Sequence, residues 1–228
     1  MEALLDRLSR LRAALRDHPE VDLICDFVGA PVPEATLAAT EARLGSPLDV
    51  GLREFYRCCN GVSICWRRRS DARPPATTSE APVWYCEDGD GQIIVEPIET
   101  VFGPRMAAHD LREVAAEGYD GESVVVFGQD LDAEDFFSTT WALSWFFENN
   151  AVLISSATKD AQGNAALVVQ GDQGIEASVH PGLSFSSWLD FILRTYGHIN
   201  AQREISRGWS ALTPPDSLDA LLEEMDRW

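Results

Sequence analysis

Residues 36–61 read TLAATEARLGSPLDVGLREFYRCCNG, and this stretch decides the fold. Its first half predicts an amphipathic helix, because Leu37, Glu41 and Leu44 keep helical spacing. Gly45 follows where a helix end favours a left-handed residue. The Pro47-Leu48 step then separates this helix from the next one.

The second half of the stretch predicts another short helix and a turn. Asp49 is a suitable N-cap, and the apolar positions that follow keep the spacing i, i+3, i+4 and i+7. These positions are Leu52, Phe55, Tyr56 and Cys59. Asn60-Gly61 ends the helix, because both residues tolerate positive φ at low cost.

Composition indicates one packed domain over residues 1–228. The chain is 45% hydrophobic, with seven Trp and ten Phe, so it can bury a large core. Its five cysteines form no C-x-x-C pair, which indicates reduced thiols and predicts a cytoplasmic location. No apolar run approaches the length that a membrane-spanning helix needs, which is about 18 residues. We therefore expect no membrane association.

Acidic groups are concentrated in one part of the chain. The net charge is −19, and residues 1–75 are balanced, so the whole excess lies after residue 75. Between Glu80 and Asp135 only Arg105 and Arg112 are basic. Such a field repels nucleic acid and attracts basic partners over roughly 8–10 Å. The basic triplet 67–69 is therefore read as part of a polar loop, either solvated or paired with acidic groups of the same chain.

Working outward, periodicity predicts helices near both ends and strands in the middle. We expect an opening helix at 4–15, a segment of undecided type at 21–28, and a strand at 62–66 followed by a polar loop to 82. The middle of the chain predicts a hairpin of 83–87 and 92–95, a helix at 107–117, a strand buried on both faces at 123–128, and strands at 136–140, 144–147 and 151–155. The last part predicts a hairpin of 165–169 and 175–179, a helix at 184–196 with Ser184 as N-cap, a polar tail, and a closing helix at 218–225. This order favours an α+β fold with a mostly antiparallel central sheet flanked by helices.

The central stretch resembles the signature of the SUKH superfamily, which includes a yeast regulator of cell-wall synthesis and many bacterial immunity proteins. The positions that carry the resemblance are Glu41, Gly45, Pro47, Leu52, Phe55, Tyr56, Asn60 and Gly61. The strand at 124–127 and the Ser-Phe-x-x-Trp-Leu helix at 184–192 continue it. The resemblance implies a SUKH-like core over about 30–197, with helical extensions at 1–29 and 198–228.

The resemblance implies binding without catalysis and without a cofactor. Bacterial members neutralise toxins, often nucleases, and a nuclease must carry basic groups for its substrate. An acidic inhibitor can occupy such a groove and associate quickly by electrostatic steering. We expect the partner-binding surface to be Glu87, Asp88, Asp90, Asp130, Asp132, Glu134 and Asp135. The plainer interpretation is a solvated acidic rim with the interface elsewhere.

Two other functions stay open at this point: a regulatory scaffold with several weaker partners, and a hydrolase that uses acidic residues. The patterns for specific chemistry fail. The run from Asp130 resembles an EF-hand start but has Asp135 where Gly is required. The four histidines are scattered, so no metal site is expected, and Cys59 lies on an apolar stripe, where core packing is its expected role.

Overall fold

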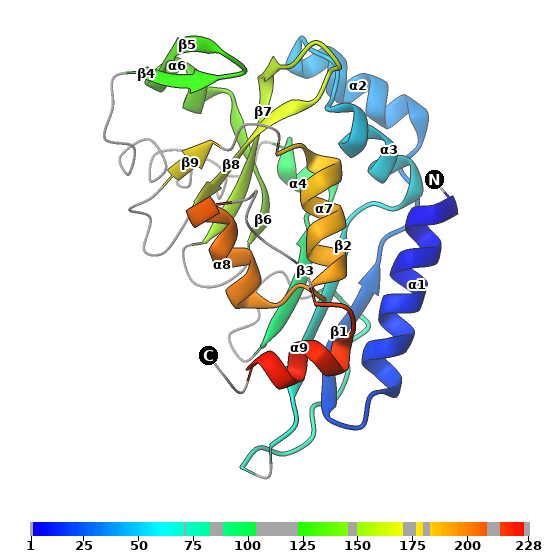
Figure 1. Cartoon of the computed structure of the whole chain (residues 1–228). Helices are drawn as coiled ribbons and strands as arrows, with labels where there is room; N and C mark the ends of the chain where they lie inside the picture. Colours follow the sequence, from blue (N-terminus) through cyan, green and yellow to red (C-terminus); the bar gives the residue numbers. More distant parts are fainter. Residues whose placement is uncertain are drawn as a thin grey trace.

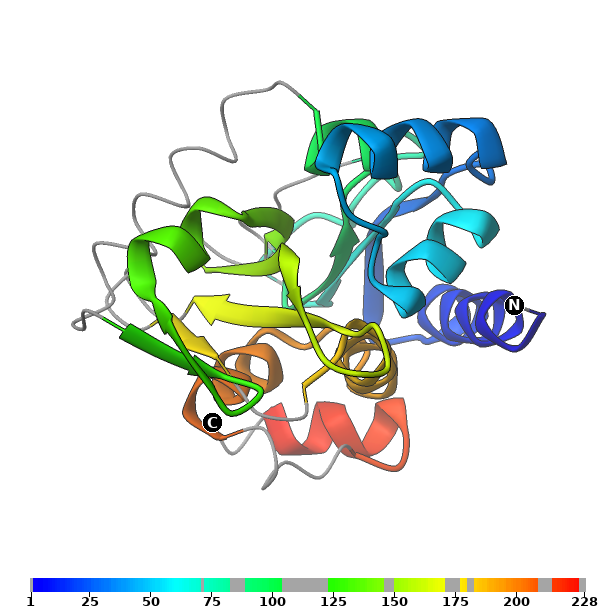
Figure 2. The same cartoon turned by 90° about the horizontal axis from the view of Figure 1, so that it is seen from above.

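The computed structural model describes residues 2–70, 72–82, 89–103, 123–145, 150–170, 177–179, 183–208 and 215–225. The fold is α+β, and all the strand pairs in the described sheets are antiparallel. Figures 1 and 2 show the strands in the middle of the molecule, with helices packed around them. The predicted strand at 83–87, helix at 107–117 and loop at 171–174 lie outside the described residues.

The first sheet contains β1 (Val21–Val28), β2 (Val62–Arg68) and β3 (Gly91–Val95), in that order. The segment of undecided type is therefore a strand. Both β2 and β3 are almost wholly buried, as expected of strands covered on two sides. Helix α1 (Glu2–Asp17) packs beside β1 and contributes leucines to the main core.

The stretch that decides the fold forms the two predicted helices, α2 (Glu34–Leu44) and α3 (Val50–Cys58). Gly45 is left-handed, with φ of 68°, as the helix end requires. The Asp49 carboxylate caps α3 by accepting the Leu52 N–H at 2.8 Å. The Glu41 carboxylate accepts the Leu48 N–H at 3.1 Å, so it fixes the connection that contains the exposed Pro47.

The side chains that follow join these helices to the sheet. The Tyr56 hydroxyl donates to the Glu96 carbonyl at 2.9 Å. The Asn60 side-chain oxygen accepts the Ile98 N–H at 2.9 Å, at the start of the short helix α4 (Ile98–Val101). Gly61 has φ of 89°, and a Cβ there would lie 2.9 Å from the Val95 carbonyl oxygen. Most signature residues thus fix a turn, a helix end or a connection, whereas Leu52 and Phe55 are buried core.

The second sheet contains β6 (Thr140–Trp145), β7 (Ala151–Lys159), β8 (Ala165–Gln170) and β9 (Ala177–Val179). The Glu96 N–H donates to the Leu143 carbonyl of β6 at 3.0 Å, and this bond connects the second sheet to the end of β3. Helix α7 (Phe185–Arg194) begins at Ser184, whose hydroxyl accepts the Ser187 N–H as predicted. It packs against α3, with Phe55 and Phe185 edge to face.

Two helices follow α7, where only one was expected. Helix α9 (Leu218–Met225) confirms the closing helix, whereas α8 (Ile199–Gly208) occupies a region taken for a polar tail. The expectation was wrong because α8 buries a polar residue: the Gln202 amide donates to the Gln92 and Gly197 carbonyls at 2.8 and 2.7 Å. Leucines of α1 and α9 belong to the same core as the sheets, so both helices pack onto the fold.

Candidate functional site

The candidate surface is a projecting unit made of β4 (Ser123–Val126), β5 (Gln129–Asp132) and α6 (Ala133–Ser138). The two strands form a separate ribbon at one end of the molecule, away from α1 in both views (Figures 1 and 2). Two expectations were wrong here. The segment 123–128 is not buried on both faces, and 136–140 begins in a helix instead of forming a strand.

Alternation along β4 gives the ribbon one buried face and one exposed face. Val124 and Val126 are buried against Phe136 and Phe137 of α6. Val125 is 65% exposed. The ribbon has only two strands and one cover, so the apolar run could bury every second residue only. Its outer face is open to solvent.

The ribbon and the first turn of α6 carry four acidic side chains. Asp130 lies opposite Val125 in the ladder, so both side chains project from the same face. Asp132, Glu134 and Asp135 follow at the start of α6, and all four acidic residues are exposed. Within the described part of the chain, none of the four forms an ion pair.

Local structure explains part of this acidity. The Asp132 carboxylate caps α6 by accepting the Asp135 N–H at 2.9 Å. Glu134 and Asp135 occupy the first turn, where the positive end of the helix dipole favours negative charge. Asp130 lies in β5 and has no such role. For Asp130, local folding therefore gives no reason for an acidic residue at this position.

An aromatic side chain lies at the tip of the ribbon. Phe127 and Gly128 form its two-residue turn, with φ of 50° and 76°. Turns of this kind favour Asn-Gly, because both positions need positive φ. Phe127 is nevertheless there, and it is 37% exposed. The surface thus combines four negative charges with two exposed apolar side chains.

Of the other predicted partner-binding residues, Asp90 is the one that the structure describes. Asp90 lies just before β3, where its carboxylate accepts the Arg68 N–H at 2.6 Å. Its carbonyl accepts the Ile199 N–H at 3.0 Å, so Asp90 has a structural role at the start of β3. Its place on a partner-binding surface stays a prediction. Glu87 and Asp88 lie outside the described residues.

The basic triplet is largely part of the sheet. Arg67 and Arg68 belong to β2, whereas a polar loop was expected from residue 67. Asp22 of β1 pairs with Arg69 at 2.7 Å and lies 3.7 Å from Arg67. The Arg69 guanidinium helps to hold the pKa of Asp22 below its usual value, against the opposing effect of burial. Among the described residues, Arg67 and Arg69 thus pair with Asp22 of β1, and Arg68 pairs with Glu20 just before it.

The other groups considered for chemistry are held in the fold. Burial raises the pKa of the Cys59 thiol to about 12, so this thiol is protonated at neutral pH. His198 is buried, and burial lowers its pKa. The His18 ring lies 3.0 Å from the Asp219 carboxylate. Among the described residues, no three His, Cys, Asp or Glu side chains converge as metal ligands would.

Comparisons with known proteins add no relative. No family model, curated protein or solved structure matches this chain. Within the described ranges, no helix has both the length and the apolar character needed to cross a membrane.

Proposed function

We propose that this chain is a cytosolic, non-enzymatic binding protein of the SUKH type that protects its cell by blocking a basic toxin domain. The observation that carries the proposal is the outer face of the β4–β5 ribbon and the first turn of α6. There Asp130, Asp132, Glu134 and Asp135 are exposed, without a described cation partner, and Asp130 lies opposite Val125.

The arrangement suits recognition of a basic protein surface better than nucleic acid. Residues 123–138 contain no Lys or Arg, so this surface repels phosphate and attracts cations. A partner groove lined with Arg or Lys could meet the carboxylates, while Val125 and Phe127 supply the apolar contacts that stable interfaces need. Electrostatic steering would then make association fast and sensitive to salt.

The test compares two variants that remove equal charge. The first, Asp130→Asn, Glu134→Gln and Asp135→Asn, removes three of the four charges and keeps the Asp132 cap. The control neutralises three exposed acids elsewhere, through Asp17→Asn, Glu80→Gln and Glu223→Gln.

The association rate is measured against the toxin domain encoded beside this gene, at low and high salt. The surface variant is expected to associate about tenfold more slowly at low salt and to lose most of its salt dependence, while the control keeps both. Equal slowing of both variants would show that only net charge matters and would remove the assignment of the surface. If no neighbouring toxin exists and no basic effector is retained, the immunity function itself fails.

A further inference from the structure

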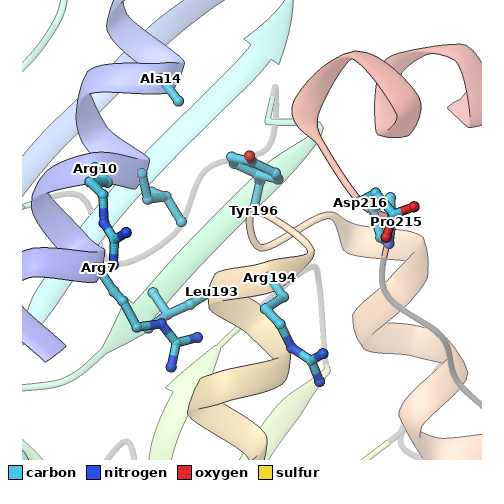
Figure 3. Close-up of a pocket in the computed structure, with 9 residues that line it drawn as sticks. Arg7, Arg10, Ala14, Leu193, Arg194, Tyr196, Pro215 and Asp216 are labelled. Carbon is cyan, nitrogen blue, oxygen red and sulfur yellow. The ribbon is translucent and has the colours of Figure 1, made fainter. Parts of the chain in front are cut away.

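A groove with two adjoining hollows runs between α1 and α7, away from the acidic surface. The first, about 320 Å³, has largely apolar walls that include Leu4, Val50, Phe55, Phe185 and Leu189. The second, about 490 Å³, is lined by Arg7, Arg10 and Arg194 together with Leu11, Tyr196 and Asp216 (Figure 3). We call them the apolar hollow and the arginine hollow. Arg7 and Leu193 line both, so the two hollows meet at these side chains, beside the Arg7–Asp190 ion pair.

The arginine hollow is rich in hydrogen-bond donors. The Asp190 carboxylate is shared by two guanidinium groups, because Arg7 lies 2.6 Å and Arg194 3.0 Å from it. Arg10 pairs only loosely with Asp6, at 3.3 Å, and both side chains are largely exposed. Each guanidinium has five N–H donors in a fork that suits a carboxylate. The described contacts with Asp190 and Asp6 use only part of these donors.

The opposite wall of the arginine hollow limits the negative charge that a ligand can carry. Asp216 lies across the hollow from Arg7 and is exposed, so it opposes a bound anion (Figure 3). Tyr196 presents its ring between them, and the backbone of Leu218 hydrogen-bonds to its hydroxyl. Together with Asp190 and Asp6, Asp216 offsets the three arginine charges, so a ligand with one negative charge fits better than one with several.

The apolar hollow gives the ligand its second property. Val50 at its wall is 52% exposed. From Leu4 to Ala14 the groove follows α1 for roughly 15 Å, at the helical rise per residue. Both volumes fall in the range of small-molecule sites, so the size favours a small amphiphile over a segment of a protein partner.

We propose that this groove binds an amphiphilic carboxylate of the fatty-acid class. The alkyl chain occupies the apolar hollow, and the carboxylate accepts hydrogen bonds from Arg7, Arg10 and Arg194. The proposal does not depend on the proposed function, since it uses none of the acidic residues of the β4–β5 ribbon or α6.

Titration calorimetry of the full chain with laurate, below micelle formation, tests the proposal. Saturable binding at one site is expected. The double variant Arg10→Gln, Arg194→Gln should weaken it about tenfold or more, because it removes charge-assisted hydrogen bonds. Asp216→Asn should tighten it, because a repulsive charge is lost, and Val50→Trp should weaken it by filling the apolar hollow. Circular dichroism confirms that each variant is folded.

One neutral probe and one cationic probe supply the controls. Dodecanol and dodecylammonium carry the same alkyl chain, and both should bind more weakly than laurate to the unaltered protein. The proposal is overturned if laurate does not saturate, if dodecylammonium binds as tightly, or if Asp216→Asn has no effect. It is equally overturned if an acidic amphipathic peptide binds the groove and laurate does not.

Discussion

Replacing Glu96 by Gln should stabilise the protein, and the gain should grow as the pH rises. Glu96 is 5% exposed and lies between β3 and α4, where its backbone joins the two larger sheets. Burial raises the pKa of its carboxyl group from the usual 4.5 to about 7. The folded state therefore binds a proton more tightly than the unfolded state does.

The sign follows from this difference. Below about pH 4.5 the group is protonated in both states and costs nothing. As the pH rises, the unfolded chain ionises first, so stability is lost until about pH 7 and stays lost above it. Since a tenfold change in proton affinity is about 1.4 kcal/mol, the full loss is about 3 kcal/mol. Gln has a similar shape and no charge, so its contribution to the stability of the folded state does not change with pH.

Urea unfolding, followed by tryptophan fluorescence, measures the stability difference between Glu96→Gln and the unaltered protein. The measurements run from about pH 5.5 to about pH 8, a range that avoids the isoelectric point near 4.4. Across this range the difference should grow by about 2 kcal/mol in favour of the variant. Glu223→Gln, at an exposed position of α9, is the control and should show no such trend. A flat or falling difference for Glu96→Gln would refute the reasoning.

Three further substitutions test other parts of the structure by urea unfolding. The buried Asp49 carboxylate accepts the Leu52 N–H at 2.8 Å and the Ala165 N–H at 2.7 Å. Asp49→Ala should therefore lower the free energy of unfolding by about 2–4 kcal/mol. A decrease of only about 1 kcal/mol, which is typical of one exposed helix cap, would contradict this. Gly29→Ala places a Cβ 2.1 Å from the Asn60 carbonyl oxygen. It should cost about 1–3 kcal/mol, whereas an unchanged midpoint would show that the backbone can move. Phe127→Asn puts a favoured residue at positive φ and should stabilise the ribbon by about 1 kcal/mol while weakening partner binding; destabilisation would mean that the ring packs on the fold.

The parts of the fold that sequence predicted well depend on local physics. Gly45, Asp49 and Ser184 mark helix ends through backbone preference and capping, and each does so in the structure. The two helices between residues 34 and 58 needed only apolar spacing in addition. No knowledge of distant contacts was required for any of them.

The errors arose where distant packing decides the outcome. Four consecutive apolar residues end at Phe127, and such a run is typical of a strand buried on both faces. In the structure the ribbon has one cover, so Val125 is exposed. Phe136 and Phe137 suggested a strand by propensity, yet the cap at Asp132 begins a helix there. That cap was the one local signal that could have identified α6.

The two candidate sites also differ in how far sequence could predict them. Asp130 and Asp135 are close in sequence, so acidity alone placed part of the candidate surface. Asp90 is acidic as well, but pairing of β3 with β2 holds it at another part of the fold. The arginine hollow had no sequence signal, because Arg7 and Arg194 meet only when α1 packs against α7.

The distribution of charge links the two proposals. The first part of the chain is balanced, and its arginines mostly pair with carboxylates of the same region, as Arg53 does with Glu34 and Glu41. The acidic side chains of the β4–β5 ribbon and α6 lie instead at the end remote from α1 (Figures 1 and 2). A basic protein approaching this end does not meet the arginines of the groove, and an anion approaching the groove does not cross the acidic face. The two surfaces can therefore act separately, and each can be disabled without the other.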